Sequence, residues 1–136
     1  MTNQMNIQLR QVSGSTSEAT LRTHQVLIDR PGEKGGADLG PMGGELFLAA
    51  VGGCFMSNLL AAIGTRKAEI AGVRTEVSGT IAGAPARFVA VELLVTAETS
   101  DRDLLERLVE MADRACIMMN TLRGKLDVCI RIGVPA

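Results

Sequence analysis

The sequence predicts an α+β fold in which antiparallel sheets wrap around one long, buried central helix. A stretch from Glu45 to Lys67 is apolar on nearly every side and is long enough for a helix. Segments of alternating apolar and polar residues, typical of strands, lie on both sides of it. A long hairpin pattern is followed by a second, amphipathic helical pattern. Strands and helices that come in separate runs are typical of an α+β fold with an antiparallel sheet.

Length and composition narrow the class of protein. A chain of 136 residues favours one domain, covering 1–136. The net charge is −1 with intermixed signs, and there are three Phe and no Trp or Tyr. Nucleic-acid binding uses a basic surface and aromatic side chains for stacking, so we expect no nucleic-acid partner.

The cysteine count bears on the redox compartment. The chain has three cysteines, one His and no C-x-x-C spacing, so it offers almost no side chains in an arrangement that could bind zinc. The first residues, MTNQMNIQLR, show no apolar run after a basic start, so no export signal is predicted. We therefore expect a cytoplasmic protein in which a cysteine pair is redox-active or simply buried.

Two extended segments are predicted before the central helix. Residues 5–12 alternate, with Met5, Ile7 and Leu9 on one face, which is typical of a half-buried strand. Residues 19–29 mix apolar and polar side chains on both faces. This mixture predicts an irregular strand or a pair of short strands.

A glycine-rich segment leads into the central helix. Residues 31–44 contain six glycines and two prolines and match no phosphate-binding motif. We interpret them as a flexible connector, and a loop that closely approaches an active site is the alternative.

The central helix itself, from Leu46 to Ile63, has only Ser57 and Asn58 as polar side chains. Such a helix must be buried on all sides. Its length is also near the lower limit for crossing a bilayer, but its adjacent glycines and polar residues favour a core helix, and we expect no membrane partner.

The second half of the chain predicts a hairpin, a helix and a last strand. Residues 73–81 and 88–97 alternate and are joined by a Gly-Ala-Pro turn. Ser100-x-x-Asp103 resembles a capping box that opens an amphipathic helix, which extends to about residue 117. After a short turn ended by Gly124, alternation resumes in a strand over residues 126–132.

The cysteines are the candidate chemical groups. Cys54 lies about nine residues into its helix, too deep for the N-terminal dipole to lower its pKa. Burial would raise that pKa, so a reactive Cys54 would need a cation such as arginine. Cys116 ends the second helix, where the dipole disfavours a thiolate, which suits a resolving thiol. Cys129 falls on a polar strand face and is interpreted as incidental. From spacing alone, cysteines that merely fill the core are the alternative.

Two strings carry a family resemblance. GPMGGELFLAAVGGCF, around Cys54, and RACIMMNTLRGKLDV, around Cys116, resemble the OsmC/Ohr family of osmotically inducible and organic hydroperoxide resistance proteins, in order along nearly the whole chain. The resemblance implies an intertwined homodimer with both central helices buried together and active sites at the interface.

The resemblance also implies a chemistry. Cys54 would be the peroxidatic cysteine and Cys116 the resolving one, reducing a small organic hydroperoxide through a Cys54 sulfenic acid and a Cys54–Cys116 disulfide. A dithiol such as dihydrolipoamide would reduce the disulfide. No metal or other cofactor is implied.

The chain departs from the family pattern near both cysteines. Gly44 stands where hydroperoxide resistance members have the glutamate that pairs with an activating arginine. Glu45 matches the next acidic position and is taken as a site residue. Arg22 is the chosen activating arginine and Arg30 the reserve. Ile117 follows the second cysteine, where peroxidases of the family usually have proline.

These departures leave a second function open. A non-catalytic member of the same fold could hold a small apolar ligand at the dimer interface. Gly44 in place of the carboxylate and the pair Met118-Met119 motivate this alternative, since methionine adapts to irregular apolar ligands.

Overall fold

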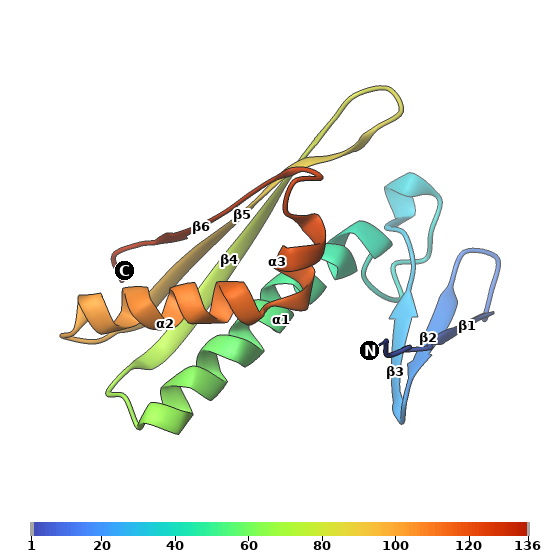
Figure 1. Ribbon diagram of the computed structural model, residues 1–136. Helices are drawn as coiled ribbons and strands as arrows, with labels where there is room; N and C mark the ends of the chain where they lie inside the picture. The colour runs from blue at the N-terminus through green and yellow to red at the C-terminus, as the bar shows by residue number, and fades with distance from the viewer. Residues whose placement is uncertain (1, 136) are drawn as a thin grey trace. The chain divides into compact units, whose positions relative to one another are not determined.

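The computed structural model describes residues 2–135, and the chain divides into two compact units, residues 1–47 and 48–136. The predicted α+β class is confirmed: two three-stranded sheets combine with helices (Figure 1). That the chain forms one domain stays a prediction. Each unit is described by itself below.

The first unit is a small antiparallel sheet in the order β1-β2-β3. Its strands are β1 (Gln8–Gln11), β2 (Ser17–Leu21) and β3 (His24–Ile28). Leu21 pairs with His24, so β2 and β3 are joined by a two-residue loop. The second predicted segment is therefore a pair of short strands, which was one of the two expectations.

The prediction that residues 5–12 form a half-buried strand is wrong. β1 is only four residues long and every residue in it is exposed. Met5, Ile7 and Leu9 are 92%, 55% and 56% exposed. Alternation predicts which side chains share a face, but it cannot say whether another layer covers that face. β1 is an edge strand of its sheet, and within the described part of the chain β2 is its one neighbour.

The second unit is built on a sheet in the order β4-β5-β6. The predicted hairpin is confirmed as β4 (Ala71–Ala82) and β5 (Arg87–Glu98), which pair antiparallel with Val77 opposite Leu93. β6 (Asp127–Ile132) pairs with β5 in parallel, so a wholly antiparallel sheet was wrong. The helices between β5 and β6 carry the chain back along the sheet, and such a crossover makes the next strand parallel.

Helix α1 (Gly43–Arg66) packs against this sheet with one face (Figure 1). Its buried residues recur at helical spacing: Val51, Gly52, Phe55, Leu59 and Ile63. On the sheet, Val91, Leu93 and Val95 of β5 are at most 1% exposed as well. Each such side chain contributes about 1.5–3 kcal/mol by burial.

Burial of α1 on all sides, as predicted, is not what the single chain shows. Leu60 is 50% exposed, and Ala49, Ala50, Gly53 and Ala61 are exposed elsewhere along the helix. By length and composition alone α1 could cross a membrane. Its buried face also makes it a core helix of the second unit, because four large apolar residues on it pack inward.

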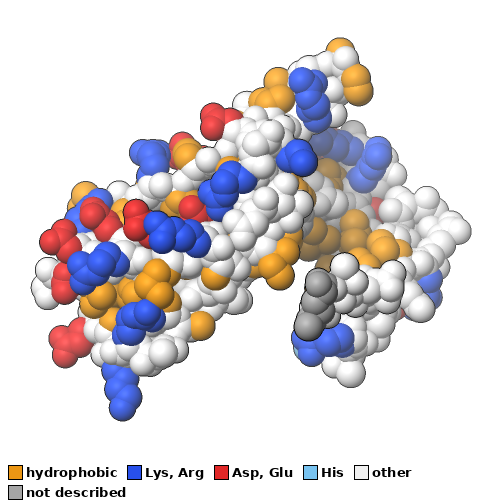
Figure 2. All heavy atoms as spheres, in the orientation of Figure 1, with side chains coloured by type: hydrophobic (Ala, Val, Ile, Leu, Met, Phe, Trp, Pro, Cys, Tyr) orange, Lys and Arg blue, Asp and Glu red, His pale blue; other side chains and the backbone are white. Residues whose placement is uncertain are grey.

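Two helices follow β5. Helix α2 (Arg102–Ala115) is capped by Asp101, whose Oδ1 accepts the Leu104 N–H at 2.9 Å, so the predicted cap at Ser100 was one residue early. Charged side chains of both signs are interspersed over the surface where α2 lies (Figure 2). A short helix, α3 (Ile117–Leu122), was not predicted; a turn was expected there.

Candidate functional site

Cys54 lies in the middle of α1, inside the second unit, and is partly accessible. The helix approaches the sheet closely next to it, because Gly52 has no side chain: a Cβ there would lie 2.6 Å from Val77 Cγ2. Asn58 Nδ2 donates to the carbonyl oxygen of Cys54 at 3.0 Å. The sequence around Cys54 thus fixes both the depth and the orientation of this turn of the helix.

Cys116 forms the junction between α2 and α3. Its extended backbone (φ −77°, ψ 114°) ends one helix and begins the next. Its Sγ accepts the Met119 N–H at 3.5 Å, so its own side chain caps α3. The residue is completely buried.

The junction is held from outside by polar contacts. Arg123 donates to Asp113 Oδ1 at 2.9 Å, and Asn120 Nδ2 donates to the carbonyl oxygen of Arg114, also at 2.9 Å. These contacts tie α3 to the last turn of α2. They therefore fix the direction in which the first peptide groups of α3 point.

The structure brings Cys54 and Cys116 together, and their pKa values move in opposite directions. Burial raises the pKa of the Cys54 thiol, but hydrogen bonds from the Met118 N–H, the Cys116 thiol and the Ile117 N–H leave that pKa below its ordinary value. Burial raises the pKa of Cys116, the Met119 N–H opposes this, and the hydrogen bond to Cys54 and its charge add to the rise. As pH rises, Cys54 is therefore the first of the pair to ionise.

The mechanism expected for Cys54 differs from what the second unit provides. A cation was expected to lower its pKa, whereas the groups that lower it here are two peptide N–H groups and one thiol. The sequence alone cannot reveal that peptide N–H groups from so distant a segment of the chain influence the pKa of Cys54. In the sequence, the one hint that this segment belongs to the site was Cys116, which is followed at helical spacing by Met119.

Cys129 lies apart from the pair, on the outward face of β6, as predicted. Its Sγ is 3.8 Å from Glu92 Oε2, and Glu92 also pairs with Arg131. Partial burial and the carboxylates of Glu92 and Asp127 raise the pKa of Cys129. It is an exposed thiol with the opposite tendency to Cys54.

The other predicted site residues lie in the first unit. Arg22 is exposed in the β2–β3 loop with a left-handed backbone (φ 57°). Glu45 is in the first turn of α1, where its Oε1 accepts the Met42 N–H at 2.9 Å, one half of a capping box. That gives Glu45 a local structural role, and the activating roles of Glu45, Arg22 and Arg30 stay predictions.

Asp29 is a buried group that sequence reasoning missed. It is 3% exposed. Its carboxylate accepts the Thr16 hydroxyl at 2.9 Å and the N–H groups of Arg30, Ala37 and Leu39 at 2.7 to 3.2 Å. Burial raises its pKa, but these hydrogen bonds lower it to about 2. The glycine-rich segment, expected to be a flexible connector, is thus pinned by one carboxylate, and an aspartate just before a glycine-rich loop was the available signal.

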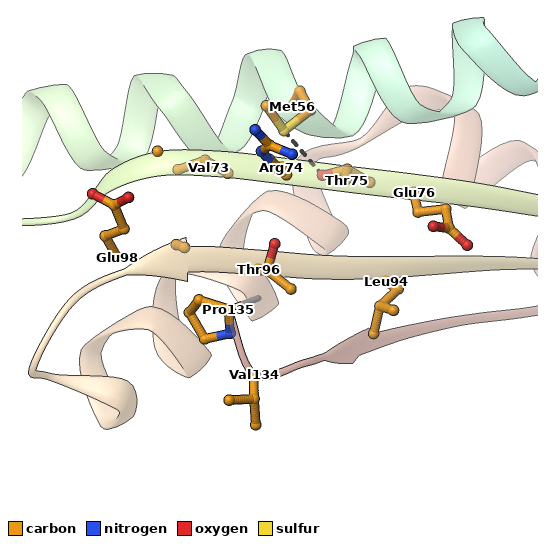
Figure 3. A pocket seen from close by; sticks show the side chains of 12 residues that line it. Met56, Val73, Arg74, Thr75, Glu76, Leu94, Thr96, Glu98, Val134 and Pro135 are labelled. Atoms are coloured by element: carbon orange, nitrogen blue, oxygen red, sulfur yellow. Dashed lines mark hydrogen bonds between the residues drawn. The ribbon is translucent and has the colours of Figure 1, made fainter.

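A cavity of about 870 Å³ lies elsewhere in the second unit (Figure 3). Met56, Leu94 and Val134 give it apolar walls, but Arg74, Glu76 and Glu98 line it as well. Met56 Sδ accepts the Thr75 hydroxyl at 3.0 Å beside it. Neither Cys54 nor Cys116 is among its lining residues.

Two further features bear on cofactors and ligands. No group of three or more metal-ligating side chains comes together within the described residues. Met119, one of the two methionines considered for ligand binding, is 1% exposed and belongs to the core.

The chain matches the family model described as OsmC-like protein over residues 35–131. No curated protein matches it. Its fold is similar to that of a hypothetical protein from Aquifex aeolicus, with a TM-score of 0.82 at 14% identity over 98% of each chain. The organic hydroperoxide resistance protein OsmC from Legionella pneumophila has a TM-score of 0.75 at 21% identity over 97% of this chain and 98% of that one. The organic hydroperoxide resistance protein OhrB of Bacillus subtilis has a TM-score of 0.68 at 22% identity over 96% and 98%.

Proposed function

The chain belongs to the OsmC-like protein family, and we propose that it is a thiol-dependent peroxidase that reduces organic hydroperoxides. One feature carries the proposal: Cys54 and Cys116 lie close enough to influence each other's ionisation, and their pKa values shift in opposite directions. The fold shared with two proteins described as organic hydroperoxide resistance proteins supports it.

The accessible sulfur of Cys54 is the attacking group. Its thiolate attacks the terminal oxygen of the hydroperoxide, which forms the S–O bond of a Cys54 sulfenic acid, breaks the O–O bond and releases an alkoxide that is protonated to an alcohol. The buried Cys116 thiol then attacks the Cys54 sulfur, which forms the disulfide and releases the sulfenic oxygen as water. The higher pKa of Cys116 suits this second role, because its thiol stays protonated and leaves the first step to Cys54.

An external dithiol closes the cycle. A dihydrolipoamide-like reductant exchanges with the Cys54–Cys116 disulfide, becomes a cyclic disulfide and returns both cysteines as thiols. Such a reductant fits the cytoplasm, the compartment we propose for this protein. The cycle uses no metal or other cofactor, and Arg22 and Arg30 are the candidates for placing a positive charge near the reacting sulfur.

We propose a homodimer as the working form. The face of α1 that the single chain leaves open is mostly apolar and made chiefly of small residues, and it includes the half-exposed Leu60. Small residues let two helices approach closely, and the open apolar face gives a second copy surface to bury. Sedimentation should give twice the chain mass of 14.4 kDa. Leu60→Glu should shift the protein toward the monomer, and a wild-type protein that sediments as a monomer would remove this proposal.

A thiol count tests the peroxidase. The reduced protein is treated with one equivalent of cumene hydroperoxide, and free thiols are titrated before and after. Wild type should lose two of its three thiols, and Cys129→Ser, the matched control, should also lose two. Cys54→Ser should lose none. Cys116→Ser should lose one, trapped by dimedone as a sulfenic acid.

The outcomes separate the two candidate functions. Retention of all three thiols by folded wild-type protein would sink the peroxidase. The non-catalytic alternative, an apolar ligand held by the same fold, would then be examined by native mass spectrometry of protein purified without reductant or detergent. Equal loss of thiols from wild type and Cys54→Ser would mean that the wrong cysteine had been assigned.

A further inference from the structure

Helix α3 is too short to keep its shape without help from its surroundings. It has six residues, and isolated helices shorter than about 12–15 residues are marginal in water. The Cys116 sulfur caps its beginning by accepting the Met119 N–H at 3.5 Å. Arg123 caps its end, where the Arg123 N–H donates to the Met119 carbonyl at 2.9 Å. The placement of α3 and the orientation of the Cys116 side chain therefore depend on each other.

The side chain of Arg123 reaches from the end of α3 back to the end of α2. Its Nη2 donates to Asp113 Oδ1 at 2.9 Å and its Nη1 to Oδ2 at 3.4 Å, so the pair is bidentate. Nη2 also donates to the Asp113 carbonyl at 3.4 Å and to Asn120 Oδ1 at 3.2 Å. A carboxylate in the last turn of a helix opposes the helix dipole, whereas a guanidinium there is favoured. The position of Asp113 is therefore explained by its pairing with Arg123.

The two residues that Arg123 contacts are also the two that hold the peptide of Cys116. The Cys116 N–H donates to the Asp113 carbonyl at 3.2 Å, and the Cys116 carbonyl accepts the Asn120 N–H at 2.9 Å. Cys116 is completely buried, so its sulfur reacts only with a group that the fold brings to it. A misplacement of about 1 Å can cost roughly 100-fold in rate. A side chain that fixes Asp113 and Asn120 thus also fixes where the Cys116 sulfur lies.

We propose that Arg123 is a positioning residue for the resolving step, because it holds the α2–α3 junction so that the Cys116 sulfur meets the oxidised Cys54 sulfur. In that step the S–S bond forms, the S–O bond of the sulfenic acid breaks, and the Cys116 proton leaves with the sulfenic oxygen as water. The inference rests on the proposed function for the roles of the two cysteines, and it adds a residue outside the pair. Arg123 acts through Asp113 and Asn120.

Arg114 provides the matched control. It follows Asp113 directly and carries the same charge at the same end of α2, where it pairs with Glu110 at 3.8 Å. Its side chain is 79% exposed, and that ion pair stays within α2. Arg114→Ala therefore removes a positive charge without untying α3. Arg123→Lys keeps the charge at position 123, but an ammonium lacks the planar fork that binds two carboxylate oxygens.

The first experiment measures the disulfide without peroxide. Each protein carries Cys129→Ser, so that Cys54 and Cys116 are the remaining thiols, and is equilibrated with mixtures of reduced and oxidised glutathione. Oxidation of the pair forms its S–S bond and reduces one glutathione disulfide to two thiols. Arg123→Ala should lower this equilibrium constant about tenfold relative to the Cys129→Ser parent, because the two sulfurs are held together less well. Arg114→Ala should match the parent, and Arg123→Lys should lie between them.

The second experiment separates the two steps of turnover. Reduced protein receives one equivalent of cumene hydroperoxide, samples are quenched with dimedone at intervals, and mass spectrometry counts the Cys54 adduct and the disulfide. Arg123→Ala should oxidise Cys54 at the parent's rate, form the disulfide roughly 10- to 100-fold more slowly and accumulate the sulfenic acid. A role confined to stability would leave the ratio of the two rates unchanged at a temperature where every variant is folded.

The glutathione equilibrium decides the proposal. A folded Arg123→Ala variant with the parent's equilibrium constant would overturn it, and so would a parent whose Cys54 and Cys116 form no disulfide with oxidised glutathione. If Arg123→Ala does not fold, Asp113→Asn takes its place, because it removes one charge of the pair at the same side-chain size. An unchanged equilibrium constant in Asp113→Asn would then refute the positioning role.

The peroxidase is judged separately. A parent that forms the disulfide with oxidised glutathione but keeps its thiols in cumene hydroperoxide is not a peroxidase. The effect of Arg123→Ala on the glutathione equilibrium still confirms or overturns the positioning role in that protein. A parent that passes the thiol count, with an Arg123→Ala variant equal to it in both experiments, is a peroxidase whose resolving cysteine is positioned without Arg123.

Discussion

The packing of α1 on the sheet can be tested with a single methyl group. Gly52 faces β4, and a Cβ at this position would lie 2.6 Å from Val77 Cγ2. Val is stiff at χ1, so the contact is relieved only by moving α1 or β4. Overpacking of this kind costs about 1–3 kcal/mol. Because Cys54 is two residues away on the same helix, such a movement would also disturb the cysteine pair.

Gly64 provides the matched control in the same helix. A Cβ at Gly64 meets no atom within 4 Å. Replacing glycine by alanine inside a helix gains about 1 kcal/mol at either position, so this gain cancels when the two variants are compared. The remaining difference is the clash alone, about 1–3 kcal/mol in favour of Gly64→Ala. For a chain of this length this corresponds to a difference in Tm of roughly 3–15 °C.

Thermal and urea unfolding, followed by circular dichroism, measure this difference. Each variant is run at several protein concentrations, because dimer dissociation makes Tm depend on concentration. Adding Val77→Ala should remove most of the penalty of Gly52→Ala, measured as a coupling energy in a double-mutant cycle. If Gly52→Ala proves as stable as Gly64→Ala, the close approach of α1 to β4 is not a real constraint on the fold.

Three other predictions follow from single contacts. Asp29→Asn should lower the urea midpoint at pH 6. The difference in urea midpoint between the variant and wild type should close between pH 4 and 2. A carboxylate whose pKa is lowered to about 2 in the folded state stabilises the fold above its unfolded pKa of 3.8, and it loses that contribution as pH falls through 2. A difference that does not change with pH would contradict this. Asp101→Ala should lower the free energy of unfolding by about 1 kcal/mol, because α2 loses its N-cap, whereas Ser100→Ala should be nearly neutral. Equal losses for the two variants would show that Asp101 is not the N-cap. At pH 7 iodoacetamide should label Cys54 before Cys129, as peptide mass spectrometry would show; the reverse order would refute the opposite pKa shifts assigned to them.

Local patterns predicted the elements well because each depends on its own residues. The apolar run around Cys54 gave α1 to within two residues at its start, and alternation on both sides of the Gly-Ala-Pro turn gave β4 and β5. What could not be predicted depends on residues far apart. β6 is parallel because of the path taken by α2 and α3, and among the described residues of the first unit no second layer covers the apolar face of β1.

The cysteine pair shows the same division. The two positions could be picked out from the residues and the family resemblance, and the two thiols lie close enough to shift each other's pKa. The direction of their pKa shifts also agrees with the roles implied for them. The peptide N–H groups that help to lower the pKa of Cys54 were not foreseen, and the activating arginine stays a prediction.

That difference affects how the departure at Gly44 is judged. A missing carboxylate matters most if an ion pair between side chains is the sole means of ionising Cys54. Here the donors at Ile117 and Met118 come from peptide bonds, which any residue except proline supplies. The glycine at position 44 therefore does not by itself argue against a reactive Cys54.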